Sequence, residues 1–486
     1  MVNQDVLAPE LNSVAQLPTA EAVQILNSLQ SQAASLLAAA LGSTPLVPFA
    51  TGGQGNFPYY WQNPSTLQFN QKTYDWIKTN LLANTTPAQL DGGNNFTNEF
   101  IRVLSCVTYS LSKADQAALN QASQNATNQQ AALLNNWVAI YGSLPPTTPG
   151  QMPIDAIVSI ICTTWSSNPN CSLMMIQNTS NLNQLLDKTP ASGKPLLPLL
   201  SNWVNALGSC VPLQNAVSMN NGYIANALSA AQAATAQNGG LTIGTTTYPA
   251  YKVATQLSDI INGLQATSNA VTLNMSVSVA NSSEYRVSVN GGTAFNIPFL
   301  DFFSLGIGGN ANYFHDEIAQ SSSSLEINMT YTGVTLVQYA PVAYDISTNK
   351  YWYFMQPINE AIRNGSSDVS GYKFNVNPNT DFSANGPFGF TQGCAIANYP
   401  SVQIKVTSSN YQSIQNTFQQ TTSFRVSFLG IPLGGGTEST YQSSTSVNAS
   451  SQQITITLTP PPSLVAGTSV DSVGWILGVQ TCYPAK

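Results

Sequence analysis

Charged side chains are what this sequence has least of: Asp, Glu, Lys and Arg make up 7% of its 486 residues, against about 25% in an ordinary globular domain. Hydrophobic residues make up 43%, which is a composition that folds. The polar surface must therefore consist largely of Asn, Gln, Ser and Thr. Such a surface favours association with like molecules, with sugars or with a membrane interface, because it carries little repulsive charge.

Basic residues are also scarce, and this excludes nucleic acid as a partner. The 14 Lys and Arg residues are scattered along the chain. The net charge is -7 and the pI is near 4.6. Nucleic-acid binding depends on Lys and Arg neutralising phosphates, so we expect none.

Histidine is nearly absent, which argues against His-based catalysis and metal binding. The single imidazole, His315, is followed by Asp316 and Glu317, but adjacent residues point to opposite faces of a strand and do not face each other on a helix. No zinc-type Cys spacing and no phosphate-binding glycine loop occurs. We therefore predict a protein that is not an enzyme and has no metal or cofactor.

A glycosidase with two distant carboxylates stays open as an alternative. Acidic residues of the C-terminal half include Asp301, Glu326, Asp345, Glu360 and Asp381.

Long apolar runs are missing as well. Residues 1–16 have neither a basic region nor a continuous apolar stretch, so we expect no ordinary signal peptide. The most apolar window, Ala33–Ala50, is interrupted by Ser, Gly and Pro, whereas a transmembrane helix needs about 20 predominantly apolar residues. We expect a chain made in soluble form that is secreted or released by a route its sequence does not show.

Six cysteines are present, and their even number favours disulfides. Cys162 and Cys171 bracket a loop-like segment and are candidates for a short disulfide. Cys394 and Cys482 both lie in the C-terminal half and are candidates for a second. Six buried thiols, which behave as small hydrophobic side chains, are the alternative.

The spacing of apolar residues changes near Ser268. Before it, they recur at helical spacing, most clearly over 22–40 and 113–141. After it, short runs alternate apolar and polar residues, as in Val271–Val279, and turns rich in Gly, Pro and Asn separate them. The sequence therefore predicts an α+β protein, with an all-helical N-terminal domain over 1–268 and an antiparallel β-sandwich-like domain over 269–486.

The β-rich half contains a weak internal repeat. Tyr285–Val289 (YRVSV) resembles Phe424–Phe428 (FRVSF), and each leads through glycines and a Ser-rich stretch to an alternating strand. We interpret 285–332 and 424–459 as an internal duplication. Convergent strand–turn–strand patterns are the alternative.

The strands that end these two copies have apolar residues on one side and almost uncharged polar residues on the other. A β-barrel pore needs strands of about 9–11 residues with this alternation. A half-buried strand of a sandwich is the alternative for each strand. The candidate membrane-inserting residues are Leu325, Ile327, Met329 and Tyr331 in the first strand, and Ile454, Ile456 and Leu458 in the second.

Two aromatic clusters are candidates for surface contacts. Phe57, Tyr59, Tyr60 and Trp61 lie among Gly, Pro and Asn, and Tyr351–Phe354 lies in the β-rich half. Tyr and Trp combine an apolar body with a polar tip, which suits sugar stacking and a membrane interface. Core packing is the alternative, and it is favoured for the second cluster.

Together these features predict a non-enzymatic, membrane-acting protein, such as a toxin-like pore-forming effector. It would oligomerise and insert Ser/Thr-rich β-hairpins from 305–332 and 429–459, with membrane lipid or a cell-surface receptor as partner. The alternatives are a self-assembling or adhesive surface protein and a carbohydrate-binding protein. Each alternative would use the neutral Asn, Gln, Ser and Thr surface.

Overall fold

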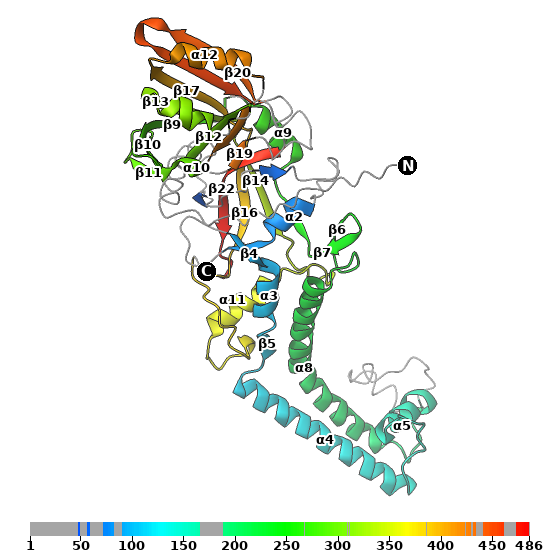
Figure 1. Cartoon of the computed structure of the whole chain (residues 1–486). Coiled ribbons are helices and arrows are strands. Elements are labelled where there is room, and N and C mark those ends of the chain that lie inside the picture. The colour runs from blue at the N-terminus through cyan, green and yellow to red at the C-terminus, as the bar shows by residue number, and fades with distance from the viewer. Residues whose placement is uncertain are drawn as a thin grey trace, which may run out of the picture.

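The computed structural model shows an elongated molecule with a β-rich end, a mixed middle region and a long helical arm (Figure 1). The described residues form both helices and antiparallel sheets in large proportion, so the predicted α+β class is confirmed at this coarse level. The structure describes residues 47–48, 56–58, 71–81, 90–165, 188–266, 268–308, 310, 312–384, 386–422, 424–428, 431–433, 441–460 and 473–485.

A seven-stranded antiparallel sheet forms the β-rich end (Figure 1). Its central strands alternate apolar and polar residues, and each strand buries its apolar side. The order across the sheet is β11 (Phe295–Pro298), β10 (Glu284–Val289), β9 (Ala270–Val279), β13 (Ser322–Thr332), β17 (Ser401–Ser408), β21 (Gln453–Thr459) and β20 (Gln442–Asn448).

A smaller sheet and three short helices cover the apolar side of this large sheet. Leu305, Phe418 and Val426 from these elements share one buried cluster with Ile327 and Ile456 of the large sheet. The predicted strand pattern therefore produces two antiparallel sheets around one core. The covering elements are β12 (Phe303–Ile307), β18 (Phe424–Phe428), β19 (Ile431–Leu433), α10 (Phe299–Phe302), η2 (Phe314–Ala319) and α12 (Tyr411–Gln420).

The middle region is built on an eight-stranded sheet that combines strands from before and after Ser268. The prediction that 1–268 is all-helical is therefore wrong. The strands from this part are only two to six residues long and depend on distant partners, so no alternating pattern marks them in the sequence. Whether 1–268 and 269–486 fold separately stays a prediction. The strands are β1 (Val47–Pro48), β2 (Asn56–Pro58), β3 (Thr79–Leu81), β4 (Leu90–Asn95), β8 (Tyr251–Val253), β14 (Thr335–Pro341), β16 (Phe390–Ala397) and β22 (Val473–Cys482).

An aromatic core packs against this sheet. Trp352 is fully buried, contacts Phe96, Phe100 and Tyr251, and donates a hydrogen bond from its indole to the carbonyl of Ala250 at 2.8 Å. The elements around the core are α2 (Gln71–Ile77), α3 (Phe96–Leu104), α9 (Leu257–Gln265) and α11 (Met355–Asn364). Two small ladders adjoin them: β5 (Val107–Ser110) with β15 (Gly371–Phe374), and β6 (Leu241–Ile243) with β7 (Thr246–Tyr248).

Among the described residues, the arm consists of two long helices that pack against each other, with two short helices at the far end (Figure 1). Helix α4 (Lys113–Tyr141) has the predicted bounds: Ser112 caps its start, and Gly142 ends it with a φ of 79° that favours glycine. Helix α8 (Leu196–Gln232) contains Pro212, which removes a backbone donor, and it changes direction along its length. The short helices are α5 (Pro153–Ser159) and η1 (Ile160–Trp165).

Helix α8 is long and apolar enough, by length and composition, to cross a membrane. Of its most apolar window, 39% is buried inside the molecule. Core helices of soluble proteins can have the same length and apolar composition, so these two properties alone do not establish a membrane span.

The two copies of the predicted duplication do not occupy equivalent positions. Strands β10 and β18 carry the matched segments, but β10 lies in the large sheet and β18 in the small one. Strands β13 and β21, which end the two copies, flank β17 on opposite sides. The duplication stays a prediction.

Buried tyrosines give the fold a predicted alkaline limit. Burial raises the pKa of Tyr251, Tyr331 and Tyr339 above the ordinary value of 10.0, because the charged phenolate is poorly solvated inside the protein. Their contribution to stability is therefore complete below about pH 10 and is lost as the pH rises further. We expect the free energy of unfolding, measured by urea titration, to fall above about pH 10. Tyrosinate absorbance should rise together with unfolding; ionisation of these phenols in a still-folded protein would contradict this.

Candidate functional site

The predicted membrane-inserting residues lie in the core of the large sheet. Leu325, Ile327, Met329 and Tyr331 on β13 are at most 3% exposed, and Ile454, Ile456 and Leu458 on β21 are fully buried. Removing seven such side chains from the core would cost roughly 10–20 kcal/mol, at about 1.5–3 kcal/mol each. In the folded structure, core packing therefore holds these seven side chains inside the large sheet.

In the described parts of 305–332 and 429–459, neither predicted hairpin lies free on the surface. Strand β13 pairs with β9 on one side and β17 on the other, and β12, which precedes it, belongs to the smaller sheet. Strand β21 pairs with β17 and with the edge strand β20 through the turn η3 (Ala449–Ser451). Each strand is thus fixed by hydrogen bonds to both neighbours.

The polar sides of the same strands form the candidate site, which we call the outward face. Register alignment places its side chains in rows across the strands β9, β13, β17, β21 and β20. One row is Asn274, Asn328, Gln403, Thr457 and Ser444, and the next is Ser276, Glu326, Lys405, Thr455 and Ser446.

Hydroxyl and amide groups on the outward face bond to one another across the strands. Thr272 and Thr330 share a hydroxyl hydrogen bond of 3.1 Å, and the Asn328 amide donates to the Gln403 amide oxygen at 3.4 Å. These side chains are half-buried, so part of each remains accessible. An amide group has two donor hydrogens and two acceptor lone pairs, which leaves capacity for a ligand.

The face carries one weak ion pair. Glu326 and Lys405 lie 3.8 Å apart, and their side chains are 49% and 37% exposed. An exposed pair at this distance contributes at most about 1 kcal/mol and is screened by salt. Charge therefore has little influence on what this surface can bind.

Two shallow grooves adjoin β9 and β13. The first, of about 550 Å³, is lined by Asn274, Asn290, Glu326, Asn328 and Lys405 among others. Asn290 sits in a turn with a φ of 48°, and its side-chain oxygen accepts the backbone N–H of Asn274 at 3.0 Å.

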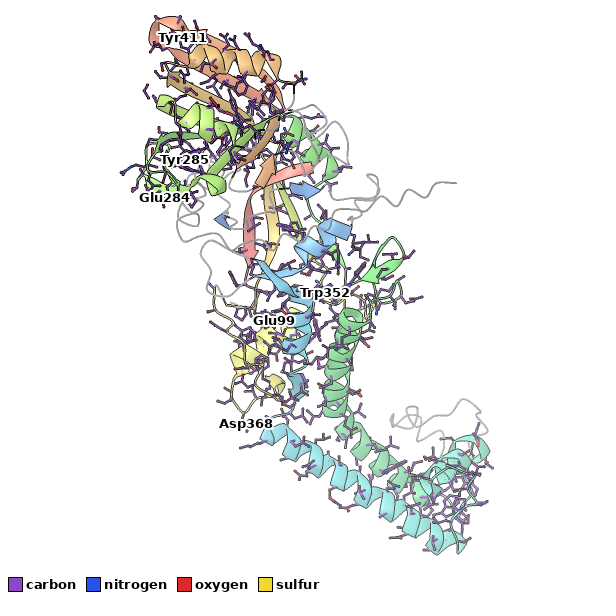
Figure 2. All side chains as sticks on the ribbon, in the orientation of Figure 1. Glu99, Glu284, Tyr285, Trp352, Asp368 and Tyr411 are labelled. Atoms are coloured by element: carbon purple, nitrogen blue, oxygen red, sulfur yellow. The ribbon has the colours of Figure 1, made fainter. Side chains whose placement is uncertain are left out.

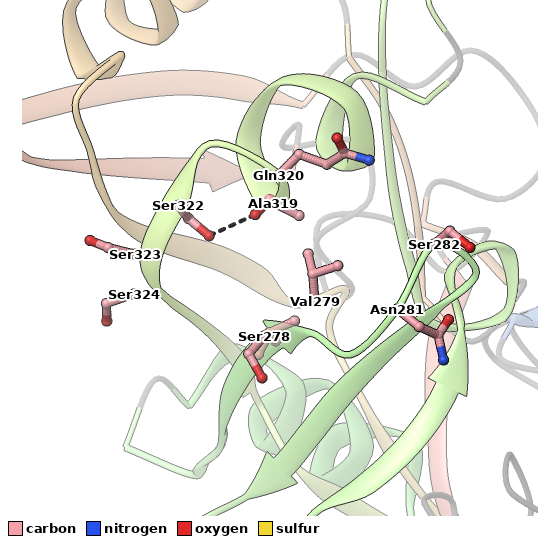
Figure 3. A pocket seen from close by; sticks show the side chains of 10 residues that line it. Ser278, Val279, Asn281, Ser282, Ala319, Gln320, Ser322, Ser323 and Ser324 are labelled. Carbon is pink, nitrogen blue, oxygen red and sulfur yellow. Dashed lines mark hydrogen bonds between the residues drawn. The ribbon is translucent and has the colours of Figure 1, made fainter.

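The second groove, of about 400 Å³, lies between the end of β9 and the start of β13 (Figure 3). Ser278, Asn281, Gln320 and Ser323 line it together with Val279, and nearby Ser322 donates to the carbonyl of Ala319 at 2.8 Å. Both grooves thus present mainly neutral donors and acceptors.

His315 lies in η2, where both ring nitrogens contact neutral groups. Nδ1 is 3.1 Å from the Tyr285 hydroxyl, Nε2 is 3.1 Å from the Gln320 amide, and the ring packs on Phe299 at 3.7 Å between centroids. Burial raises the pKa of Tyr285, so its phenol stays neutral. These contacts give His315 a structural role in joining η2 to β10.

The carboxylates considered for a glycosidase have separate local partners. Asp345 accepts hydrogen bonds from Ser347 and Thr348, which lower its pKa, and Asp381 is held in the same way by Ser383. Glu360 accepts the backbone N–H of Tyr372 at 3.3 Å, and Glu326 lies on the outward face. The side chain of Asp301 is outside the described part. Within that part, no group of three or more His, Cys, Asp or Glu side chains could hold a metal.

The disulfide predicted between Cys394 and Cys482 is wrong. In the β16–β22 ladder, Cys394 lies opposite Val479 and Cys482 opposite Phe390. The two cysteines are thus about four strand positions, or about 13 Å, out of register, whereas a disulfide needs Cα atoms within about 7 Å. Cys162 is buried in η1, and Cys171 lies outside the described residues, so that pair stays a prediction.

The structure describes the side chains of the second aromatic cluster but not those of the first. Phe57 falls in β2, but its side chain lies outside the described part, as do Tyr59, Tyr60 and Trp61, so the exposure of this cluster stays a prediction. Trp352 and Phe354 are buried, which confirms core packing for these two members of the second cluster.

Neighbouring residues of β21 should respond differently to substitution. Ile456→Ala removes a fully buried side chain, and we expect it to lower the free energy of unfolding by about 2–5 kcal/mol. Thr457→Val changes only the outward face and keeps the branched side chain, so we expect a change within about 0.5 kcal/mol. Urea unfolding measures both, and equal effects would mean that the two faces are not distinguished by burial.

Comparison with known proteins assigns no family to the chain. No family model matches it, and neither the curated proteins nor the solved structures contain a match.

Proposed function

We propose that this is a non-enzymatic binding protein that attaches to a neutral carbohydrate chain through its outward face. The observation that carries the proposal is the pair of aligned rows across five neighbouring strands, in which every side chain is a hydroxyl or an amide except Glu326 and Lys405. Sugar hydroxyls are both donors and acceptors, so they complement such side chains without requiring charge.

The geometry of the face supports an extended ligand over a small compact one. Neighbouring strands lie about 4.8 Å apart, so each row presents hydrogen-bonding groups at a regular spacing. The grooves beside β9 and β13 are shallow, and each is lined mainly by polar groups. A deep apolar pocket is the usual setting for a small-molecule ligand. A chain with repeated hydroxyl groups can contact several rows at once.

Pore formation through β13 and β21 remains a proposal of lower rank. It would require both strands to leave the centre of the sheet and seven buried side chains to leave the core. Strand β21 has seven residues, fewer than the about 9–11 that a membrane-spanning strand needs. An adhesive surface protein, by contrast, would use the outward face as it stands.

Three further proposals concern the domain architecture, the location and the self-association of the protein. We propose that the two packed sheets of the β-rich end are the β-sandwich-like domain expected within 269–486. We also propose that the protein is secreted or released, since neutral carbohydrate chains are abundant outside cells. Self-association into a homo-oligomer would multiply weak contacts to such a polymer.

Carbohydrate binding can be tested with two matched double variants. Asn328→Ala with Gln403→Ala removes two amides from the outward face, and Asn120→Ala with Gln124→Ala removes two exposed amides from the arm. Each hydrogen bond contributes about 0.5–1.5 kcal/mol, so we expect about tenfold weaker binding from the first variant and no change from the second. A glycan array and sedimentation with insoluble neutral polysaccharides are the measurements.

Two results would contradict the proposed function. One is the absence of binding to every neutral glycan and polysaccharide tested. The other is equal binding by the wild type and the outward-face variant while the arm variant binds more weakly. Release of sugar products during the assay would instead support the carboxylate-pair alternative.

A further inference from the structure

Exposed apolar side chains gather at the far end of the arm. Val138 and Tyr141 on α4, Leu144 in the following loop, and Met152 before α5 are 38%, 40%, 39% and 58% exposed. Four of the ten large hydrophobic side chains that are exposed among the described residues thus lie within 138–152. We call this segment the arm tip.

The arm tip lies far from the rest of the molecule, and the arm is fixed at its other end. Figure 1 shows α4 running away from the middle region, with the loop after it at the extremity. At the base, Asp368 accepts the backbone N–H of Lys113 at 2.9 Å, and Ser370 bonds both Ser112 and Asp115 (Figure 2). The exposed side chains are therefore held away from the body.

A small core of its own holds the tip in shape. Trp137 packs between Tyr141, at 4.6 Å, and Trp165, at 5.9 Å between ring centroids. Leu133, Ile157 and other buried side chains of α4, α5, η1 and α8 complete this cluster, which is separate from the two larger cores. The exposed apolar groups are thus presented by a folded structure.

The arm tip itself carries no charged side chain. Residues 116–154 contain no Asp, Glu, Lys or Arg, and neither does α8. Two charged residues lie beside the arm tip: Asp155 accepts the backbone N–H of Met152 at 3.1 Å, and exposed Lys194 is two residues from Ser192, which shares a hydrogen bond with Tyr141. Shallow insertion of residues 138–152 into an apolar layer would bury no charged side chain of the segment itself, which removes the main penalty against insertion. Ser143, Thr147, Thr148 and Gln151 provide neutral groups that can bond at the level of lipid headgroups.

We propose that the arm tip docks into the interface of a lipid bilayer with electrically neutral headgroups. Tyr and Trp are the aromatic residues enriched at this interface, and Leu, Met and Val can enter the acyl boundary below it. A stable protein partner would need about 20–30 residues on each side, far more than four exposed side chains. This inference is independent of carbohydrate binding, which uses the opposite end of the molecule.

The test is flotation of the full-length protein with vesicles of pure phosphatidylcholine, and of phosphatidylcholine mixed with phosphatidylserine. The tip variant combines Tyr141→Ser, Leu144→Ser and Met152→Ser. Its control combines Ile346→Ser, Val369→Ser and Val376→Ser, which are 44%, 41% and 60% exposed on the body of the molecule. Circular dichroism and thermal unfolding establish that both variants are folded.

We expect the wild type and the control to bind both kinds of vesicle equally, at low and at high salt. The tip variant should bind at least about tenfold more weakly, because three apolar contacts are lost. Unchanged binding by the tip variant would overturn the proposal, and so would no wild-type binding to phosphatidylcholine. Binding that requires phosphatidylserine and falls with salt would also overturn it.

A protein contact at the tip would give a different result. Analytical ultracentrifugation without lipid would then show self-association of the wild type that the tip substitutions abolish, and this outcome too would overturn the lipid assignment. The tip variant should keep any carbohydrate binding of the wild type, so failure of this inference and failure of the proposed function are distinguishable.

Discussion

The alternation of apolar and polar residues in four adjacent strands is the constraint on which the rest of the β-rich end depends. In β9, β13, β17 and β21, every second side chain belongs to a single core shared with β12, β18 and α12. A shift of register by one residue would expose Ile327 and bury Asn328, so the pairing is strongly specified. The same constraint aligns the polar side chains into rows, and the candidate site follows from the packing of the core.

The surface is made mainly of neutral polar side chains, because charged residues are scarce. Three ion pairs occur among the described residues, and the pairs Lys78–Asp75 and Arg102–Glu99 each lie within one local segment. Stability therefore depends on three hydrophobic cores and on neutral hydrogen bonds. Such a surface is little affected by salt, and it can approach an uncharged sugar chain or a neutral membrane without losing ion pairs.

Local patterns in the sequence predicted local structure well. The bounds of α4 followed from its caps and composition, and the buried and polar sides of β13 and β21 followed from strict alternation. The sequence does not predict the partners of these strands, because β13 pairs with β17 although β14, α11, β15 and β16 lie between them along the chain. The sequence does not predict short strands such as β3 and β4, because backbone pairing defines them and no alternating side-chain pattern marks them. The outward face went unrecognised as one surface for the same reason: its rows exist only once the register is known.

The central claim is that β13 and β21 stay in the large sheet while the outward face and the arm tip make the contacts. Hydrogen–deuterium exchange of the full-length protein, measured with and without phosphatidylcholine vesicles, tests it directly. We expect slow exchange in peptides covering β13 and β21 under both conditions, and slower exchange in 138–152 when vesicles are present. Faster exchange of β13 and β21 upon adding vesicles would show that these strands leave the sheet, and would contradict the account.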